Sequence, residues 1–210
     1  MKRYLYTLLF YTLSSSIAAQ YYPTDTLQLN KAFRAIVKGD NTYEKQLDFF
    51  KAFPSTWLEY TLTYLYSPEK DFDISMSQLA SEHCTIFGDS LYLIDNTTYC
   101  NKYVNLVIGL NDTGENCIVL QEKLHATMRK RDNTMMHIIS KLRKGHQMQF
   151  WQFYWSNIID GNHQQEEFNK LYNKNKEKYP AMMKTMSIAF EYFNTGVLFM
   201  EDFNNFMNSR

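Results

Sequence analysis

The most apolar stretch of the chain lies between Gly145 and Gly161, in the sequence GHQMQFWQFYWSNIIDG. Within six consecutive positions it carries five aromatic side chains: Phe150, Trp151, Phe153, Tyr154 and Trp155. At 3.6 residues per turn these side chains cover most of the circumference of a helix, and such a helix belongs inside a protein. The pattern therefore predicts a central buried helix. The alternative is a platform that stacks on a carbohydrate or peptide, which would be apolar on one face only.

Elsewhere, apolar residues recur at helical spacing between capping residues in front and glycine or proline behind. These signals predict helices over 24–39, 41–53, 56–67, 75–88, 95–109, 118–128, 132–142, 166–178, 180–193 and 197–207. The segment 91–94 is ambiguous. Helices start about every 15 to 20 residues, which is typical of helical hairpins, but no residue pattern repeats at a fixed period. We therefore predict an all-α fold, an irregular array of antiparallel helical hairpins in a single domain around the aromatic-rich central helix.

Composition agrees with this fold class. The 210 residues include 16 Tyr and 15 Phe but only 7 Gly and 4 Pro, so the chain lacks the frequent turn residues of a β-sandwich or barrel. A chain of this length is long enough to build a substantial core in one domain.

The first 19 residues have the three parts of a secretory signal peptide. Lys2 and Arg3 precede the apolar run Tyr4–Leu13, and small residues follow up to Ala19. We expect cleavage after Ala18 or Ala19, which leaves residues 20–210 as the exported domain in the periplasm or outside the cell. The apolar run is much shorter than the roughly 20 residues that span a bilayer, so we expect no stable membrane insertion after cleavage.

The chain has three cysteines, Cys84, Cys100 and Cys117. Export permits disulfide formation, but three thiols allow at most one bond within the chain. Because the helices that carry Cys84 and Cys100 are expected to be consecutive and antiparallel, these two are the expected pair. The alternative is that both are buried, reduced thiols.

Motifs for chemistry are incomplete throughout the sequence. Glu122 and His125 have the Glu-x-x-His spacing of a helical di-iron site, but such a site needs the motif twice. Asp71, Asp73 and Glu82 match positions of a calcium loop in which Met76 replaces the required glycine. No nucleophile elbow or phosphate-binding loop is complete. We therefore predict no catalytic residues, no metal site and no cofactor, and expect that the protein is not an enzyme.

A basic stretch follows position 122. It contains the six residues that we identify as a candidate partner-binding surface: Arg129, Lys130, Arg131, Lys141, Arg143 and Lys144. They could simply form solvated helix faces, or they could dock a partner. The net charge is zero, and nucleic acid is not an expected partner outside the cytoplasm. An acidic protein, anionic lipid headgroups or cell-wall polymers are the partner classes that remain.

Two aromatic stretches carry a resemblance to a known group of proteins: FFKAFPSTWLEYTLTYLY at 49–66 and GHQMQFWQFYWSNI at 145–158. They resemble small exported helical proteins of Bacteroidota, some of which are similar to immunity partners of type VI secretion effectors. This resemblance implies a periplasmic immunity protein that binds and neutralises a toxin effector delivered by a neighbouring bacterium. The alternative is a cell-envelope enzyme or ligand-binding protein, which a deep pocket with two convergent carboxylates would favour.

Overall fold

The computed structural model describes residues 24–39, 41–64, 76–109, 117–156 and 161–195, and these residues are mainly helical, with no strand among them. The helices are α2 (Thr26–Val37), α3 (Tyr43–Ala52), α4 (Trp57–Tyr64), α5 (Met76–Asp89), α6 (Asn96–Val107), α7 (Ile118–Ser140), α8 (Lys144–Trp155), α9 (Gly161–Asn175) and α10 (Pro180–Thr195). The all-α prediction is confirmed. The expected signal peptide, the helix over 197–207, and Asp71 and Asp73 lie outside the described residues.

Several helices begin where the capping residues predict. Asp25 and Asp95 are the N-caps of α2 and α6, and each carboxylate accepts the backbone N–H three residues later, at 3.0 and 2.9 Å. The N-cap of α3 is Thr42, one residue after the start of the predicted range 41–53. The Asn41 side chain instead donates to the carbonyl oxygen of Ser90 at 3.1 Å, so its role is set by a turn far along the chain.

The predicted break between helices 118–128 and 132–142 is present as a kink inside α7. Arg131 is the one residue of α7 with non-helical backbone angles, φ −130° and ψ 29°. Its guanidinium carbon lies 4.2 Å from the centroid of the Tyr99 ring on α6, so the kink coincides with a stacking contact between two helices.

The start of α9 differs from the prediction. It begins at Gly161 rather than at Glu166, and its first turn carries polar residues that gave no apolar signal. The buried amide of Gln164 donates to the carbonyl oxygen of Trp155 at 2.9 Å. This turn is therefore held against the end of α8 by a tertiary hydrogen bond, which local sequence does not reveal.

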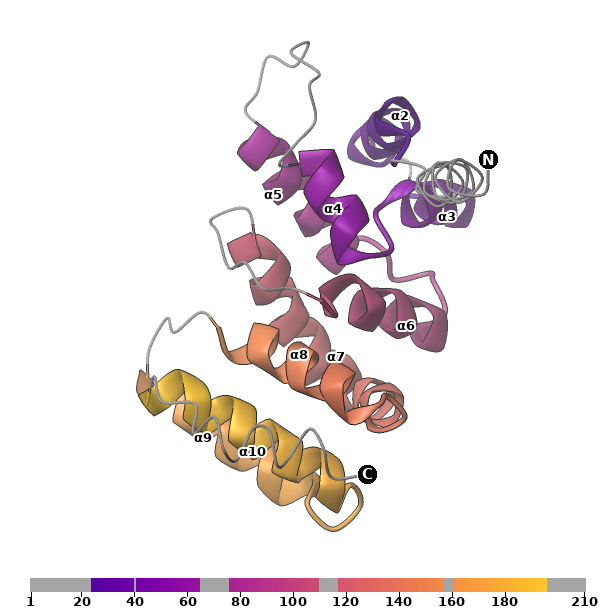
Figure 1. Ribbon diagram of the computed structural model, residues 1–210. Helices are drawn as coiled ribbons and strands as arrows, with labels where there is room; N and C mark the ends of the chain where they lie inside the picture. The colour runs from indigo at the N-terminus through magenta and orange to yellow at the C-terminus, as the bar shows by residue number, and fades with distance from the viewer. Residues whose placement is uncertain (1–23, 40, 65–75, 110–116, 157–160, 196–210) are drawn as a thin grey trace, which may run out of the picture.

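The helices pack in sequence order from α2 and α3 at one end to α9 and α10 at the other (Figure 1). Helix α2 packs on α3, both α5 and α6 pack on α7, and α10 packs on α8. One continuous apolar core runs through this stack. No helix among the described residues combines the length and the apolar character needed to cross a membrane.

Helix α8 carries the aromatic stretch into the core, as predicted. The exposed fraction of Trp151, Tyr154 and Trp155 is 0% for each. The Trp155 ring lies 5.1 Å from the ring of Phe190 on α10 and 6.1 Å from that of Phe168 on α9. The buried-helix interpretation is confirmed, and the stacking-platform alternative is excluded because no face of these rings reaches the surface.

Gly88 lies in the last turn of α5, which ends at Asp89, one residue beyond the predicted helix end. A Cβ atom at this position would stand 2.6 Å from the Cβ of Lys123 on α7, which is closer than packed atoms can approach. The glycine is therefore required for the close contact of α5 with α7.

We expect Gly88→Ala to lower the free energy of unfolding by about 1 to 3 kcal/mol, because the two helices must move apart. The better helix propensity of alanine offsets up to about 1 kcal/mol of this loss. Urea denaturation followed by circular dichroism measures the change, with Thr85→Ala, at an exposed position of the same helix, as the control. A Gly88→Ala protein as stable as the parent would show that α5 and α7 are not in this contact.

Candidate functional site

The basic residues of the predicted partner-binding surface fall into two groups in the structure. Arg129 lies 3.8 Å from the carboxylate of Glu167 on α9. The guanidinium of Arg131 stacks on Tyr99, and its Nη1 atom is buried without a hydrogen-bond partner in the described structure. Lys130 is exposed on α7. These three residues therefore do not form one surface, because two of them are engaged by neighbouring helices.

The other three predicted residues gather in the turn between α7 and α8. Lys141 and Arg143 are exposed, and Lys144 is half-buried. The Arg143 guanidinium donates to the Nε2 atom of His146 through Nε at 2.9 Å and through Nη2 at 2.6 Å. Partial burial and the charge of Arg143 lower the pKa of His146, so the imidazole is an acceptor here.

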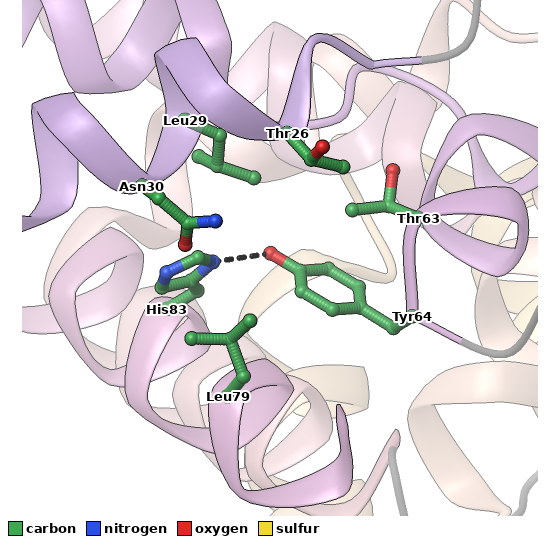
Figure 2. A pocket seen from close by; sticks show the side chains of 7 residues that line it. All are labelled: Thr26, Leu29, Asn30, Thr63, Tyr64, Leu79 and His83. Carbon is green, nitrogen blue, oxygen red and sulfur yellow. Dashed lines mark hydrogen bonds between the residues drawn. The ribbon is translucent and has the colours of Figure 1, made fainter. Parts of the chain in front are cut away.

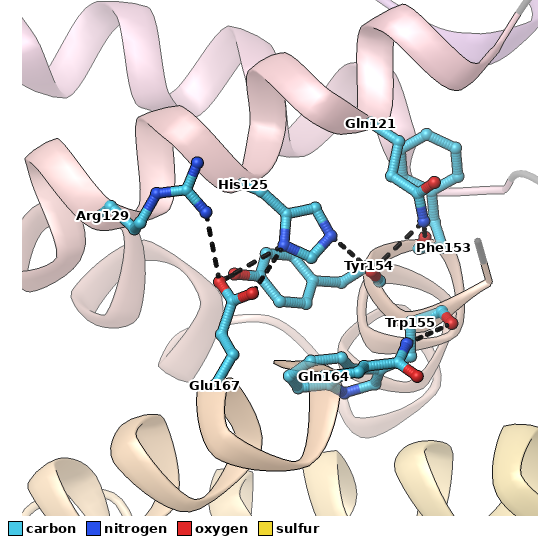
Figure 3. A network of polar contacts seen from close by, with 8 residues as sticks. All are labelled: Gln121, His125, Arg129, Phe153, Tyr154, Trp155, Gln164 and Glu167. Carbon is cyan, nitrogen blue, oxygen red and sulfur yellow. Dashed lines mark hydrogen bonds and ion pairs between the residues drawn. The ribbon is translucent and has the colours of Figure 1, made fainter. Parts of the chain in front are cut away.

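A second group of polar residues centres on Glu167 of α9 (Figure 3). Its carboxylate faces the Nδ1 atom of His125 at 3.1 Å and accepts from the hydroxyl of Tyr154 at 2.6 Å. Burial raises the pKa of Glu167, but the hydrogen bonds from His125 and Tyr154 and the charge of Arg129 outweigh it, so the net shift is downward. The carboxylate is therefore held ionised between three helices.

The remaining atoms of this network serve the end of α8. His125 Nε2 lies 2.9 Å from the carbonyl oxygen of Tyr154. The amide of Gln121 donates to the carbonyl oxygens of Phe153 and Tyr154, at 2.6 and 3.2 Å. Carbonyl groups in the last turn of a helix have no partner within the helix. The network of Figure 3 thus caps the end of α8 from α7 and α9.

A small cavity lies between α2, α4 and α5 and is lined by His83 (Figure 2). His83 is fully buried, and its Nδ1 atom lies 2.8 Å from the hydroxyl of Tyr64. Burial lowers the pKa of His83 to about 3, so the imidazole is neutral near pH 7. The cavity volume of about 10 Å³ gives room for one water molecule. Since no carboxylate lines it, the cavity lacks the acid and base pair of a hydrolytic site.

A wider polar depression of about 230 Å³ lies where α2 and α4 begin and α3 ends. Two of its lining residues are the carboxylates Asp25 and Glu59. Both serve as helix caps: Asp25 accepts the N–H of Gln28 at 3.0 Å, and Glu59 accepts the N–H of Ser55 at 2.6 Å. The depression is smaller than the roughly 300 Å³ at which ligand pockets begin.

The three cysteines are separate buried thiols in the structure, which does not contain the expected bond between Cys84 and Cys100. The Sγ atom of Cys84 lies 3.4 Å from the hydroxyl of Tyr60, and burial raises the pKa of this thiol to about 12. Burial also raises the pKa of Cys100, to about 11, while Arg131 opposes this rise. Thiols with such pKa values are poor nucleophiles at neutral pH.

A buried lysine was not identified from the sequence. The Nζ atom of Lys102 on α6 donates to the carbonyl oxygen of Phe50, in the last turn of α3, and lies 4.8 Å from the centroid of the Phe50 ring. Burial lowers the pKa of Lys102 to about 8, although Glu59 acts in the opposite direction. A cation at a helix C-terminus interacts favourably with the helix dipole, so Lys102 serves as a cap for α3.

Several exposed apolar side chains lie at two turns that are joined by partly buried hydrogen bonds. Gln46, which is 0% exposed, accepts the N–H of Leu93 at 2.8 Å and donates to the carbonyl oxygen of Asn41 at 3.3 Å. The Asn41 side chain donates to the carbonyl oxygen of Ser90, and this hydrogen bond joins the same two turns. Around it stand four side chains with large exposed fractions: Val37 at 59%, Tyr43 at 49%, Tyr92 at 63% and Leu93 at 45%. We call these four residues the paired-turn surface.

Two kinds of surface are thus available for binding: the paired-turn surface and the basic turn between α7 and α8. The sequence identified the basic turn by its charge, but the paired-turn surface gave no signal, because it depends on Gln46 reaching a turn 47 residues away. The described residues hold no group of three or more His, Cys, Asp or Glu placed to bind a metal ion. In comparisons with known proteins, no family model matches this chain, and no curated protein and no solved structure matches it.

Proposed function

We propose that this protein is a periplasmic immunity protein that binds and neutralises a toxin effector delivered by a neighbouring bacterium. The observation that carries the proposal is the paired-turn surface. Exposed tyrosine side chains are typical of the central contacts of protein interfaces. Here they stand on backbone that Gln46 and Asn41 hold in place.

Rigidity supports binding by such a surface. Side chains on backbone that is already ordered lose little conformational entropy when a partner binds. Ring stacking ties α3 to α5, the helices next to the two turns: the ring of Phe50 stacks on that of Phe87 at 6.3 Å, and Phe53 stacks on Phe87 at 4.4 Å. This packing limits the relative movement of the two helices. A binding protein of this kind needs a shaped surface of roughly 800 Å² and no catalytic group.

Binding of the toxin encoded beside this gene tests the proposal. Tyr92→Ala and Tyr43→Ala should each weaken binding about tenfold, the usual cost of removing an interface tyrosine. The control is Leu27→Ala, since Leu27 is 76% exposed at the opposite end of α2 from Val37. Isothermal titration calorimetry with the purified toxin measures the dissociation constants.

Protection of cells gives the second readout. Deleting the gene should make cells sensitive to the toxin, and the parent gene should restore protection more fully than the Tyr92→Ala variant. The proposal fails if the purified protein forms no complex with the toxin, or if the deletion leaves sensitivity unchanged.

A ligand-binding or enzymatic role in the cell envelope is the second candidate. It would have to use the polar depression lined by Asp25 and Glu59, whose carboxylates both cap helices. Under this alternative, Glu59→Gln would abolish the cellular phenotype while Tyr92→Ala left it intact, the reverse of the result expected for toxin binding.

A further inference from the structure

We propose that the basic turn, defined as Lys141, Arg143, Lys144 and His146, binds an acidic segment of the protein partner through its Asp and Glu carboxylates. This inference rests on the proposed function and names the chemistry of the partner. It also assigns the turn a second property, which is that a proton is taken up at His146 when the carboxylate binds.

The first argument is that no carboxylate among the described residues neutralises Lys141 or Arg143. In the described part of the chain, neither Lys141 nor Arg143 forms an ion pair with a carboxylate. The next acidic residue along α7, Asp132, is paired with Lys174 of α9. Because no described carboxylate pairs with Lys141 or Arg143, these two charges can attract an oppositely charged surface and raise the rate of association.

The second argument is the geometry of Arg143. Its guanidinium donates two hydrogen bonds to a neutral imidazole, at 2.9 and 2.6 Å, although guanidinium groups bind carboxylates more strongly. The pair lies on the surface, where a carboxylate from a partner can take the place of the imidazole as acceptor. Arg143 is also the N-cap of α8 without a side-chain cap bond, so the positive end of the helix dipole adds to the same field.

The third argument concerns His146. Arg143 is the charged group that the structure places against it, and together with burial it lowers the pKa of His146. A bound carboxylate adds negative charge beside the imidazole and favours its protonated form. Binding and proton uptake are therefore linked, and affinity should rise as the pH falls.

A lipid surface fits this turn less well than an acidic protein. Membrane-binding segments combine basic side chains with exposed apolar ones that enter the headgroup region. The apolar residue of this turn, Leu142, is partly buried and packs against the core.

A fluorescein-labelled hexaglutamate peptide is a suitable probe, with binding to the full exported chain followed by fluorescence anisotropy. Arg143→Gln should weaken binding about tenfold, and Lys141→Gln should weaken it less, because lysine offers a point charge rather than a planar fork. Lys130→Gln is the matched control: Lys130 is an exposed basic residue of the same helix, outside the turn. Equal weakening by Lys130→Gln would overturn the assignment to the basic turn.

The pH dependence of binding distinguishes proton uptake at His146 from a general attraction between opposite charges. Affinity for hexaglutamate should increase about threefold between pH 7.5 and 5.5, and His146→Gln should remove this increase while retaining the dependence on salt. An unchanged pH profile in His146→Gln would overturn the linkage. Binding to vesicles of phosphatidylglycerol without binding to the peptide would overturn the choice of partner.

The toxin itself distinguishes this inference from the proposed function. If the toxin binds and Arg143→Gln has no effect on its association rate, the inference fails while the proposed function stands. If hexaglutamate binds at Arg143 and the toxin does not bind, the proposed function fails and the acidic partner is another protein.

Discussion

Replacing Trp155 by alanine is expected to lower the free energy of unfolding by about 3 to 5 kcal/mol, which is the cost of removing a large, fully buried aromatic side chain. Trp155 is 0% exposed and lies between three helices. Its ring contacts Phe168 of α9 and Phe190 of α10, as well as Trp151 one turn earlier at 6.4 Å. The alanine variant leaves a cavity at the point where α8, α9 and α10 meet.

The size of this loss depends on packing rather than on hydrogen bonding. The indole Nε1 atoms of Trp151 and Trp155 are both buried without a hydrogen-bond partner in the described structure. Trp155→Phe should therefore cost less than Trp155→Ala, because phenylalanine retains a ring and removes an unpaired donor. Trp151→Ala should behave like Trp155→Ala.

Guanidinium chloride denaturation, followed by far-ultraviolet circular dichroism, measures these changes. Trp57→Ala is the control, because Trp57 is only partly buried at the start of α4 and should cost less than either core tryptophan. A Trp155→Ala protein with parental stability and lost partner binding would contradict the core assignment and make this residue part of an interface.

How well the sequence predicts the fold depends on how far apart in the chain the interacting residues lie. Asp25 and Asp95 begin their helices through bonds to residues three positions away. Gly39 and Gly109, which end two helices, have φ angles of 101° and 94°, in the left-handed region that glycine adopts without strain. Such signals are complete within one turn of chain, so the sequence predicts them.

Features that depend on distant residues were not predictable in the same way. Gly88 was interpreted only as a helix end, and α5 does end one residue later, but the sequence did not show that the glycine also admits Lys123 of α7. The start of α9 depends on Gln164 reaching the end of α8. In both places tertiary packing decides the local conformation, and the sequence pattern does not contain the partner.

The candidate sites also combine features that the local sequence predicts with features that depend on distant residues. Clustered charge in the sequence identified Arg143, Arg129 and Arg131 as equivalent candidates for partner binding. Only the fold shows that Glu167 engages Arg129, 38 positions earlier, and that the ring of Tyr99 engages Arg131. His125 was considered as half of an incomplete metal motif with Glu122, whereas its carboxylate partner is Glu167, 42 positions away.

Glu167→Gln is expected to lower the free energy of unfolding at pH 7 by about 2 kcal/mol. The substitution keeps the shape of the side chain but replaces charge-assisted hydrogen bonds, which contribute about 1.5 to 3 kcal/mol, by neutral ones. It also places an amide that donates where His125 and Tyr154 both require an acceptor. Glu166→Gln is the matched control, since Glu166 is the exposed neighbour on the same helix.

The pH dependence identifies the charge as the cause. Because the pKa of Glu167 is lower in the folded protein than in the unfolded chain, its ionised form stabilises the fold. This contribution is fully present above the unfolded pKa of about 4.3 and is lost as the pH falls through the folded value. The stability difference between the parent and Glu167→Gln, measured by urea denaturation, should therefore shrink between pH 6 and pH 3, whereas Glu166→Gln should show little difference across this range. A constant difference at all pH values would mean that shape rather than charge holds α9 to α7 and α8.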